Sequence, residues 1–311
     1  MDLQQVRTRI TVGYDGTASS VTAVEWAAHE AELRDAQLSL VYCCSTSAAM
    51  GSSIGSCFAV TFDPRDIERA SRLQVESMAA EMHRRHPDLE CSAEASPGSP
   101  RDVLVDASDA SALMVVGMTR SGALSRLVGS VAGAVIRRSR CPVVSVPSWS
   151  TSRTRFNRVV VGVDGSPPSV TALRWATEEA ARRDAELVLI HAWRLAFSSP
   201  AVVHEAERVV VEAEAAALLV GMMQSRPAGE RRRSASGALV EDHAATALLA
   251  AAESADLVVV GSRGQGGVRS RLSGSIAQVL TEHAPCPVAV IHRDLTVPWE
   301  NRRPTDLQLR P

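Results

Sequence analysis

The sequence contains no lysine, so all 33 of its basic residues are arginines. A P-loop needs a lysine to reach the phosphates, and an enzyme of the Schiff-base type needs a lysine amine, so both classes are excluded. Six cysteines are present, but none forms a Cys-x-x-Cys pair or has the spacing of a zinc site. We therefore expect free thiols in a reducing compartment and no metal ligands.

Long apolar runs are also missing. No stretch approaches the roughly 18 apolar residues of a membrane span, and the N-terminal MDLQQVRTRI lacks the apolar core of a signal peptide. The net charge of −2 argues against a broad basic surface for nucleic acid. The sequence predicts a cytoplasmic protein with neither a membrane nor a nucleic-acid partner.

What the chain does contain is an internal repeat. Residues 12–38 (VGYDGTASSVTAVEWAAHEAELRDAQL) align without a gap with residues 161–187 (VGVDGSPPSVTALRWATEEAARRDAEL), and this alignment pairs Asp15 with Asp164. Further along, residues 115–135 pair with residues 259–279. The two halves are therefore tandem copies of one unit.

The repeat suggests the domain boundaries. Residues 147–155 (PSWSTSRTR) are polar and without periodicity, as expected of a linker. After Arg293 the chain has three prolines and no apolar pattern, which is typical of a loose tail. We predict a first domain over 1–147, a second over 156–293 and a C-terminal tail over 294–311.

Each copy alternates β-branched runs with longer amphipathic stretches, the pattern of βαβ units around a mostly parallel sheet. In the second copy we expect strands near 158–163, 187–192, 236–240, 257–261 and 288–291. The first helix of that copy should begin after Gly165, with Ser166 as its N-cap and Pro167 in its first turn. Its buried face should carry Val170, Leu173, Ala176 and Ala180.

The second copy has a glycine-rich loop after its fourth predicted strand, in VVVGSRGQGGVRSRLSGS (258–275). Glycines between a strand and a helix let the backbone approach an anion, and the first amides of the helix point at it. The spacing fits neither a P-loop nor the dinucleotide motif, which follows the first strand rather than the fourth. A different nucleotide site is indicated.

These residues resemble the universal stress proteins, whose ATP-binding members carry Gly-x2-Gly-x9-Gly-Ser/Thr after the fourth strand. Gly261, Gly264, Gly274 and Ser275 match that motif at every position. The flanking VGVDGS (161–166) and HAPCPVAVI (283–291) resemble the family's first and last strands, so the likeness spans nearly the whole chain as a tandem pair. It implies an α/β fold of two doubly wound domains, each with a five-stranded parallel sheet of order 3-2-1-4-5 flanked by helices.

The resemblance also implies ATP at the carboxyl ends of strands 1 and 4, where strand order reverses. In the second copy Asp164, after Gly162, would contact the ribose or adenine, and amides around Gly264, Gly274 and Ser275 would hold the phosphates. Arg263 is a flanking cation that solvation alone would also explain, and Ile190 would border the base through its backbone. A tight turn is the alternative reading of Asp164.

The first copy departs from the motif. It has Gly13 and Asp15 at the first strand and Gly117 after the fourth, but Arg120 replaces the second glycine unless Gly122 takes its place. The loop also reaches Gly129 and Ser130 one residue early. Gly98-Ser99-Pro100 keeps the family's Gly-x-Pro step, where the second copy has Glu241-Asp242-His243. Whether both copies bind nucleotide stays open.

The sequence contains no convincing nucleophile with its base, pair of carboxylates or metal cluster. The favoured function is therefore an ATP-binding regulatory protein with little or no hydrolysis and no catalytic residues, with Mg²⁺ beside the ATP left open. The alternatives are a slow ATPase and a nucleotide-independent dimeric scaffold. A flavodoxin-like FMN protein is disfavoured because Asp15 and Asp164 would repel a phosphate after strand 1.

The family's last strands pair with one another. The resemblance therefore implies a homodimer, or an intramolecular pseudo-dimer, formed through the valine-rich CPVVSV and CPVAVI segments.

Overall fold

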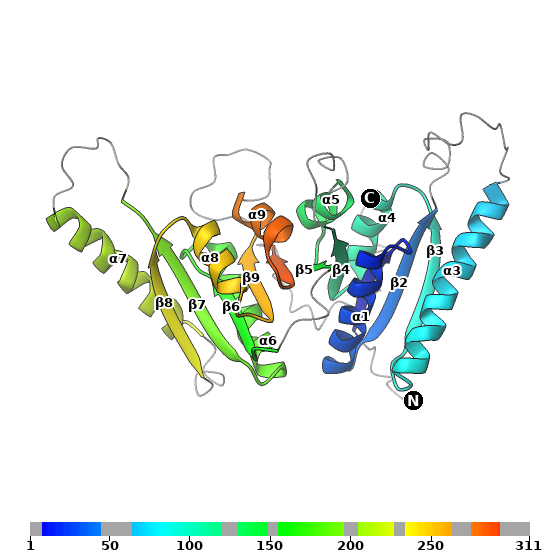
Figure 1. Ribbon diagram of the computed structural model, residues 1–311, viewed down its shortest axis with the longest axis horizontal. Coiled ribbons are helices and arrows are strands. Elements are labelled where there is room, and N and C mark those ends of the chain that lie inside the picture. Colours follow the sequence, from blue (N-terminus) through cyan, green and yellow to red (C-terminus); the bar gives the residue numbers. More distant parts are fainter. Residues whose placement is uncertain are drawn as a thin grey trace, which may run out of the picture. The chain divides into compact units, whose positions relative to one another are not determined.

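The computed structural model describes residues 8–44, 64–119, 130–148, 155–195, 205–226, 234–262 and 275–292. Within these ranges the chain forms two compact units (Figure 1). Of the described residues, unit 1 contains 8–148 and unit 2 contains 155–292.

Strands and helices alternate along unit 1. Its elements are β1 (Arg9–Tyr14), α1 (Ala18–Leu33), β2 (Gln37–Cys44), α3 (Pro64–Arg85), β3 (Cys91–Pro97), α4 (Pro100–Ala107), the 3-10 turn η1 (Ser108–Ala110), β4 (Leu113–Met118), α5 (Ser130–Arg138) and β5 (Val143–Pro147). The strands pair in the order β3-β2-β1-β4-β5, and every neighbouring pair is parallel. The predicted order 3-2-1-4-5 is confirmed.

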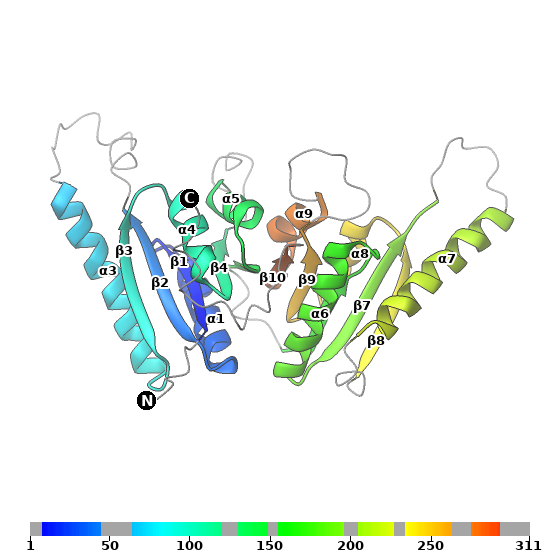
Figure 2. The ribbon, with the colours of Figure 1, turned by 180° about the vertical axis from the view of Figure 1, so that it is seen from behind.

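Unit 2 repeats this arrangement (Figure 2). Its elements are β6 (Arg158–Gly162), α6 (Pro167–Arg182), β7 (Glu186–Trp193), α7 (Glu205–Gln224), β8 (Ala235–Glu241), α8 (Ala244–Ala252), β9 (Leu257–Gly261), α9 (Ser275–His283) and β10 (Val288–Ile291). The order is β8-β7-β6-β9-β10, again all parallel. All five predicted strands are present, and each boundary lies within two residues of its prediction.

Helices cover both faces of each sheet. In unit 1, neighbouring residues of β1 show this directly, because successive strand residues point to opposite faces. Gly13 faces Leu104 of α4, whereas the Tyr14 hydroxyl is hydrogen-bonded to Gln74 of α3. The strand order reverses between β1 and β4. The connections that leave these two strands therefore cross on opposite faces of the sheet, which leaves a crevice at their carboxyl ends.

The first helix of each unit is fixed at both ends by short-range contacts. Thr17 and Ser166 are the N-caps, and each side chain accepts a hydrogen bond from the backbone three residues on. At the other end Asp35 and Asp184 adopt positive φ angles of 48° and 49°, with the bonds of a Schellman motif. The repeated Arg-Asp-Ala triplet thus ends a helix.

The predicted buried face of α6 is correct except at its start. Leu173, Ala176 and Ala180 are buried, but Val170 is 37% exposed. Val170 lies in the first turn, where the neighbouring serines, rather than the valine, face the strand ends; Ser169 is 4% exposed and its hydroxyl accepts from the Asp164 amide. Local hydrogen bonding therefore decides the orientation of this turn.

The first glycines of the two loops, Gly117 and Gly261, lie at the carboxyl ends of β4 and β9, where each strand contacts the first helix of its unit. Gly117 is the last residue but one of β4, and Gly261 is the last residue of β9. A Cβ on Gly117 would lie 2.4 Å from the carbonyl oxygen of Ser19, and one on Gly261 would lie 2.9 Å from the carbonyl carbon of Pro168. Both obstacles are backbone atoms, which cannot turn aside. Each glycine therefore has a packing role, whatever it contributes to a ligand.

Within the described ranges, no helix combines the length and the apolar character needed to cross a membrane.

We predict that Gly117→Ala and Gly261→Ala each destabilise the protein by about 1–3 kcal/mol, because the added methyl forces strand and helix apart. Gly221→Ala is the matched control, since a Cβ there meets nothing within 4 Å and Ala favours α7 by about 0.5–1 kcal/mol. Urea unfolding followed by circular dichroism measures all three. Equal stability of the three variants would contradict the packing role.

Candidate functional site

Asp15 forms a tight turn between β1 and α1. Its Oδ1 accepts hydrogen bonds from the amide of Thr17 at 3.0 Å and from the Thr17 hydroxyl at 2.6 Å. The Asp15 amide donates to the Ser20 hydroxyl at 3.3 Å. Gly16, between Asp15 and Thr17, has a positive φ of 81°. The turn uses only Oδ1, so among the described residues Oδ2 is left to accept from a ligand.

Unit 2 builds the same turn around Asp164. The Asp164 Oδ1 accepts from the amide of Ser166 at 2.9 Å and from the Ser166 hydroxyl at 2.5 Å. Gly165 has a positive φ of 76°. Asp164 therefore forms the tight turn that was the alternative interpretation of this residue. Forming the turn does not prevent its carboxylate from also binding a ligand.

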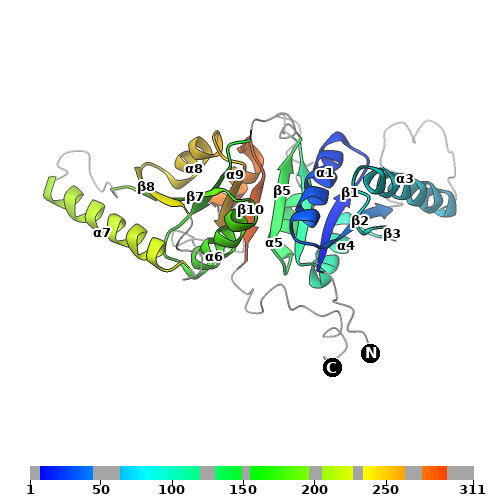
Figure 3. The ribbon, with the colours of Figure 1, turned by 90° about the horizontal axis from the view of Figure 1, so that it is seen from below.

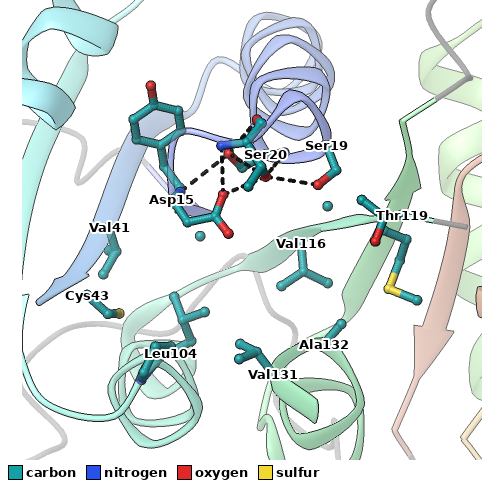
Figure 4. A pocket seen from close by; sticks show the side chains of 16 residues that line it. Asp15, Ser19, Ser20, Val41, Cys43, Leu104, Val116, Thr119, Val131 and Ala132 are labelled. Atoms are coloured by element: carbon teal, nitrogen blue, oxygen red, sulfur yellow. Dashed lines mark hydrogen bonds between the residues drawn. The ribbon is translucent and has the colours of Figure 1, made fainter. Parts of the chain in front are cut away.

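A pocket of about 230 Å³ opens beside Asp15 at the carboxyl ends of β1 and β4 (Figure 4). It takes its walls from β1, the start of α1, β2, α4, β4 and the start of α5. The lining residues are Gly13, Tyr14, Asp15, Thr17, Ser19, Ser20, Val41, Cys43, Pro100, Leu104, Val116, Gly117, Met118, Thr119, Val131 and Ala132.

The pocket has one acidic wall and one apolar wall. Figure 4 shows Asp15, Ser19 and Ser20 on the side of α1, facing Leu104 and Val131 across the space. Among the described lining residues none is an arginine or a histidine, so Asp15 is the one charged group. The part of the pocket beside Asp15 therefore suits a neutral, partly apolar group with hydroxyls rather than a phosphate.

The side chains of Tyr14 and Tyr42 point toward α3, where they are hydrogen-bonded to Gln74 and Ser71. Tyr14 and Tyr42 meet edge to face with ring centroids 6.3 Å apart. Burial raises the pKa of Tyr14 above its usual value, and the charge of Asp15 raises it further, although the hydrogen bond with Gln74 acts in the opposite direction. Both hydroxyls therefore stay protonated at neutral pH and serve as packing and hydrogen-bonding groups, since burial also raises the pKa of Tyr42.

Cys43 lines the pocket from β2. Burial, together with the charges of Cys44 and Glu94, raises the pKa of its thiol from 9.0 to about 12. Burial alone raises the pKa of Cys91 to about 11. The thiolate is the nucleophilic form, so neither residue is a nucleophile at neutral pH. The expectation of free thiols holds for the five cysteines in the described ranges, and Cys57 lies outside them.

The structure brings together the described residues predicted for the first copy, since Gly13, Asp15 and Gly117 all line the pocket. In unit 2, Gly162, Asp164, Ile190 and Gly261 occupy the equivalent places on β6, the turn, β7 and β9. The remaining predicted loop residues, Gly122, Gly129, Arg263, Gly264 and Gly274, lie outside the described residues. Ser130 and Ser275 are the first residues of α5 and α9.

The contact between the Ile190 backbone and a base stays a prediction. The Ile190 carbonyl accepts from the Val163 amide at 2.9 Å, and β7 continues past Ile190 to Trp193.

One detail of the alignment by sequence needs correction. Strands β3 and β8 place Pro97 and Glu241 at equivalent positions, so Gly98-Ser99-Pro100 corresponds to Asp242-His243-Ala244, one residue later than in that alignment.

Sequence reasoning missed most of the apolar wall. Val41 and Cys43 could have been found from the alternation of β2, because residues two apart face the same side. Leu104 on α4 and Val131 on α5 gave no signal beyond ordinary helix patterning. They become neighbours of Asp15 only when α4 and α5 pack on one face of the sheet.

The chain matches known proteins over both units. The model of the universal stress protein family matches residues 7–147 and 155–292. A universal stress protein of Mycobacterium tuberculosis is 34% identical over 292 residues, which cover 92% of this chain and 97% of the relative. The crystal structure of a universal stress protein from Archaeoglobus fulgidus matches with a TM-score of 0.67 at 18% identity, covering 92% of this chain and 98% of that one, and it shows the fold.

A third match is a universal stress protein whose crystal structure was determined in complex with cAMP. It covers 45% of this chain and 97% of its own at 22% identity, with a TM-score of 0.34. At this TM-score the match identifies no ligand of the present chain.

We predict that Cys43 of the native protein is alkylated by iodoacetamide at least about thirtyfold more slowly at pH 8 than a thiol of ordinary pKa. Its thiolate fraction is about a thousandfold lower, and the greater nucleophilicity of a more basic thiolate offsets only part of that factor. Peptide mass spectrometry measures the rate at Cys43, and protein unfolded in guanidinium is the control. The rate should rise tenfold for each pH step of one until the pH nears 12. Equal rates in native and unfolded protein would contradict the raised pKa.

Proposed function

The chain belongs to the universal stress protein family, and on that premise we propose that it is a regulatory protein that binds ATP at the crevice between the first and fourth strands of a unit, with little or no hydrolysis. The observation that carries the proposal is the pocket beside Asp15. It lies where the strand order reverses, which is where open α/β sheets bind ligands.

The size and charge of the pocket support a bound nucleoside. Pockets for whole small ligands range from about 300 to 1,000 Å³, so 230 Å³ suits the base and ribose of a nucleotide rather than the entire molecule. The apolar side chains of Leu104, Val116 and Val131 would contact the base. Asp15 Oδ2 would accept a hydrogen bond from a ribose hydroxyl, a strong bond because the acceptor is charged.

The phosphates would then lie at the other end of the pocket, away from the Asp15 carboxylate. Met118 and Thr119, from the end of β4, and Ala132, from the first turn of α5, line that side. Backbone amides at the start of a helix favour anions. In the described ranges no three His, Cys, Asp or Glu residues are placed to hold a metal, so Mg²⁺ would be held by the phosphates and water.

The pocket supports binding rather than catalysis. Asp15 is the one carboxylate among its described lining residues, and its Oδ1 is already committed to the turn. The Cys43 thiol stays protonated at neutral pH because its pKa is about 12. A slow ATPase remains the second candidate, and a turnover above about 1 s⁻¹, the low end of ordinary enzymes, would favour it.

Asp15→Asn tests the site in unit 1, and Asp164→Asn is its matched variant in unit 2. An asparagine oxygen can still accept from the turn, so each fold should keep its unfolding midpoint while losing the charged acceptor. We expect ATP affinity at the altered unit to fall about 10-fold to 100-fold, the effect of a hydrogen bond to a charged group. Isothermal titration calorimetry of the wild type also reports whether one or two sites fill.

The two variants decide between the functions. If both bind ATP with wild-type affinity, the aspartates do not hold the ligand. If the wild type binds no ATP at all and releases no nucleotide on denaturation, the protein is better described as a nucleotide-independent scaffold. Association through the last strands, β5 and β10, stays a prediction in either case.

Protection of Cys43 tests the ligand's place in unit 1 independently. Saturating ATP should lower the alkylation rate of Cys43 at about pH 10 by at least tenfold, because the ligand covers the thiol. Cys91 is the internal control, since it does not line the pocket and its rate should not change. An unchanged rate at Cys43 with ATP bound elsewhere in the protein would remove unit 1 from the proposal.

A further inference from the structure

Helix α7 of unit 2 carries an apolar stripe on the side turned away from its sheet. The helix packs on β7 and β8 through Ala215, Leu219 and Met222, which are 6–7% exposed. Figure 3 shows α7 lying along these strands with its other side facing outward. On that outer side Val209 and Val210 are 56% exposed and Val220 is 51% exposed. The stripe is defined as Val209, Val210, Ala213, Ala217, Val220 and Gly221, all of which are exposed.

The same position in unit 1 shows that the stripe is not a requirement of the fold. Helix α3 buries Val75 and Met82 where α7 buries Ala215 and Met222, which fixes the register between the two helices. In this register Arg69 replaces Val209, Glu81 replaces Gly221, and Leu73, which is 60% exposed, replaces Ala213. The outer face of α3 therefore has one exposed leucine between charged residues, whereas the stripe of α7 contains no charged residue. The valines of α7 need another explanation.

The large and small residues of the stripe follow nearly the same order whether the helix is followed from its N-terminus or from its C-terminus. In an antiparallel pair of α7 helices, a two-fold axis can cross the outer face at the level of Ala215. Val210 then faces Val220 of the second copy, and Ala213 faces Ala217. Val209 then faces Gly221. Each end thus has a valine against a valine and a valine against a glycine, and small residues meet at the centre, where the helices must approach closely. A two-fold interface needs this kind of self-complementary surface.

The charges of α7 favour the same orientation. The acidic residues whose side chains the structure describes, Glu207, Glu212 and Glu214, all lie in the first half of the helix. Antiparallel packing places them beside the uncharged second half of the partner, whereas parallel packing would place acid against acid. Arg208 does not change this balance, because it is paired with Glu241 at 2.7 Å. The acidic flank also disfavours an anionic lipid surface.

We propose that α7 is a self-association surface, on which a second copy of this chain docks through its own α7 in antiparallel orientation. The stripe is about 18 Å long at 1.5 Å per residue. A helix contact of that length buries well under about 1,200 Å² in total, so the interface belongs to the transient class. The dimer should therefore form reversibly at high protein concentration, with a dissociation constant on the order of 100 µM.

Sedimentation velocity between about 10 and 500 µM tests the proposal. The wild-type sedimentation coefficient should rise with concentration, and Val210→Glu should abolish that rise. The matched control is Ala70→Glu at the equivalent exposed position of α3, which should associate like the wild type. Both substitutions lie on solvent-facing positions, and unchanged unfolding midpoints verify the fold.

The orientation is tested by mixing two variants. Val210→Glu and Val220→Arg should each associate at least tenfold more weakly than the wild type alone, but a one-to-one mixture should recover the dimer, because the new charges face one another only in the antiparallel pair. No recovery means that the pairing is not antiparallel as proposed. A wild type that stays monomeric at the highest concentration, or a Val210→Glu variant that associates like the wild type, overturns the proposal.

A lipid partner gives a different result. If the wild type is monomeric in solution but sediments with phosphatidylglycerol vesicles, and Val210→Glu does not, the stripe is a membrane-contacting face and the self-association proposal is wrong.

Discussion

Each unit depends on the close approach of its fourth strand to the first turn of its first helix. At this contact a glycine, Gly117 or Gly261, lies against the backbone of Ser19 or Pro168, with no room for a side chain. The same turn carries Asp15 or Asp164, held by hydrogen bonds to its own N-cap residue. Because two strands of a parallel sheet end at the same edge, this contact places a fixed carboxylate beside the end of the fourth strand. The candidate site is a consequence of that packing.

The glycines and aspartates that suggested a nucleotide site therefore have structural duties as well. Gly117 is required by backbone packing, and Asp15 forms a turn through its Oδ1. Neither structural role excludes a contact between the same residue and a ligand. The Asp15 carboxylate keeps one oxygen on the pocket side, and β4 ends with its backbone next to the start of α5. A residue that is held rigidly by a structural bond is better placed to recognise a ligand, because less conformational freedom is lost on binding.

The two copies have kept one scaffold and diverged on its surface. The Asp turn, the Schellman ending of the first helix and the strand order recur in both units. Unit 1 has a cysteine at the pocket, Cys43, where unit 2 has Ala192. Unit 2 has an uncharged apolar stripe on α7, where the outer face of α3 has an exposed leucine between charged residues. Positions inside the fold are constrained by backbone contacts, while exposed positions are free to acquire separate functions.

The sequence by itself determined the tandem repeat, the five strands of each unit, the cap at Ser166 and the aspartate turn, because all of these follow from local periodicity and short-range hydrogen bonds. The strand order came from the resemblance of the glycine loop to a family rather than from periodicity. Only the tertiary structure decided that Leu104 and Val131 face Asp15, that the Ile190 carbonyl accepts from the Val163 amide, and that Gly98 corresponds to Asp242. These facts depend on how helices and strands far apart in the chain pack together, and no local pattern of residues records that packing.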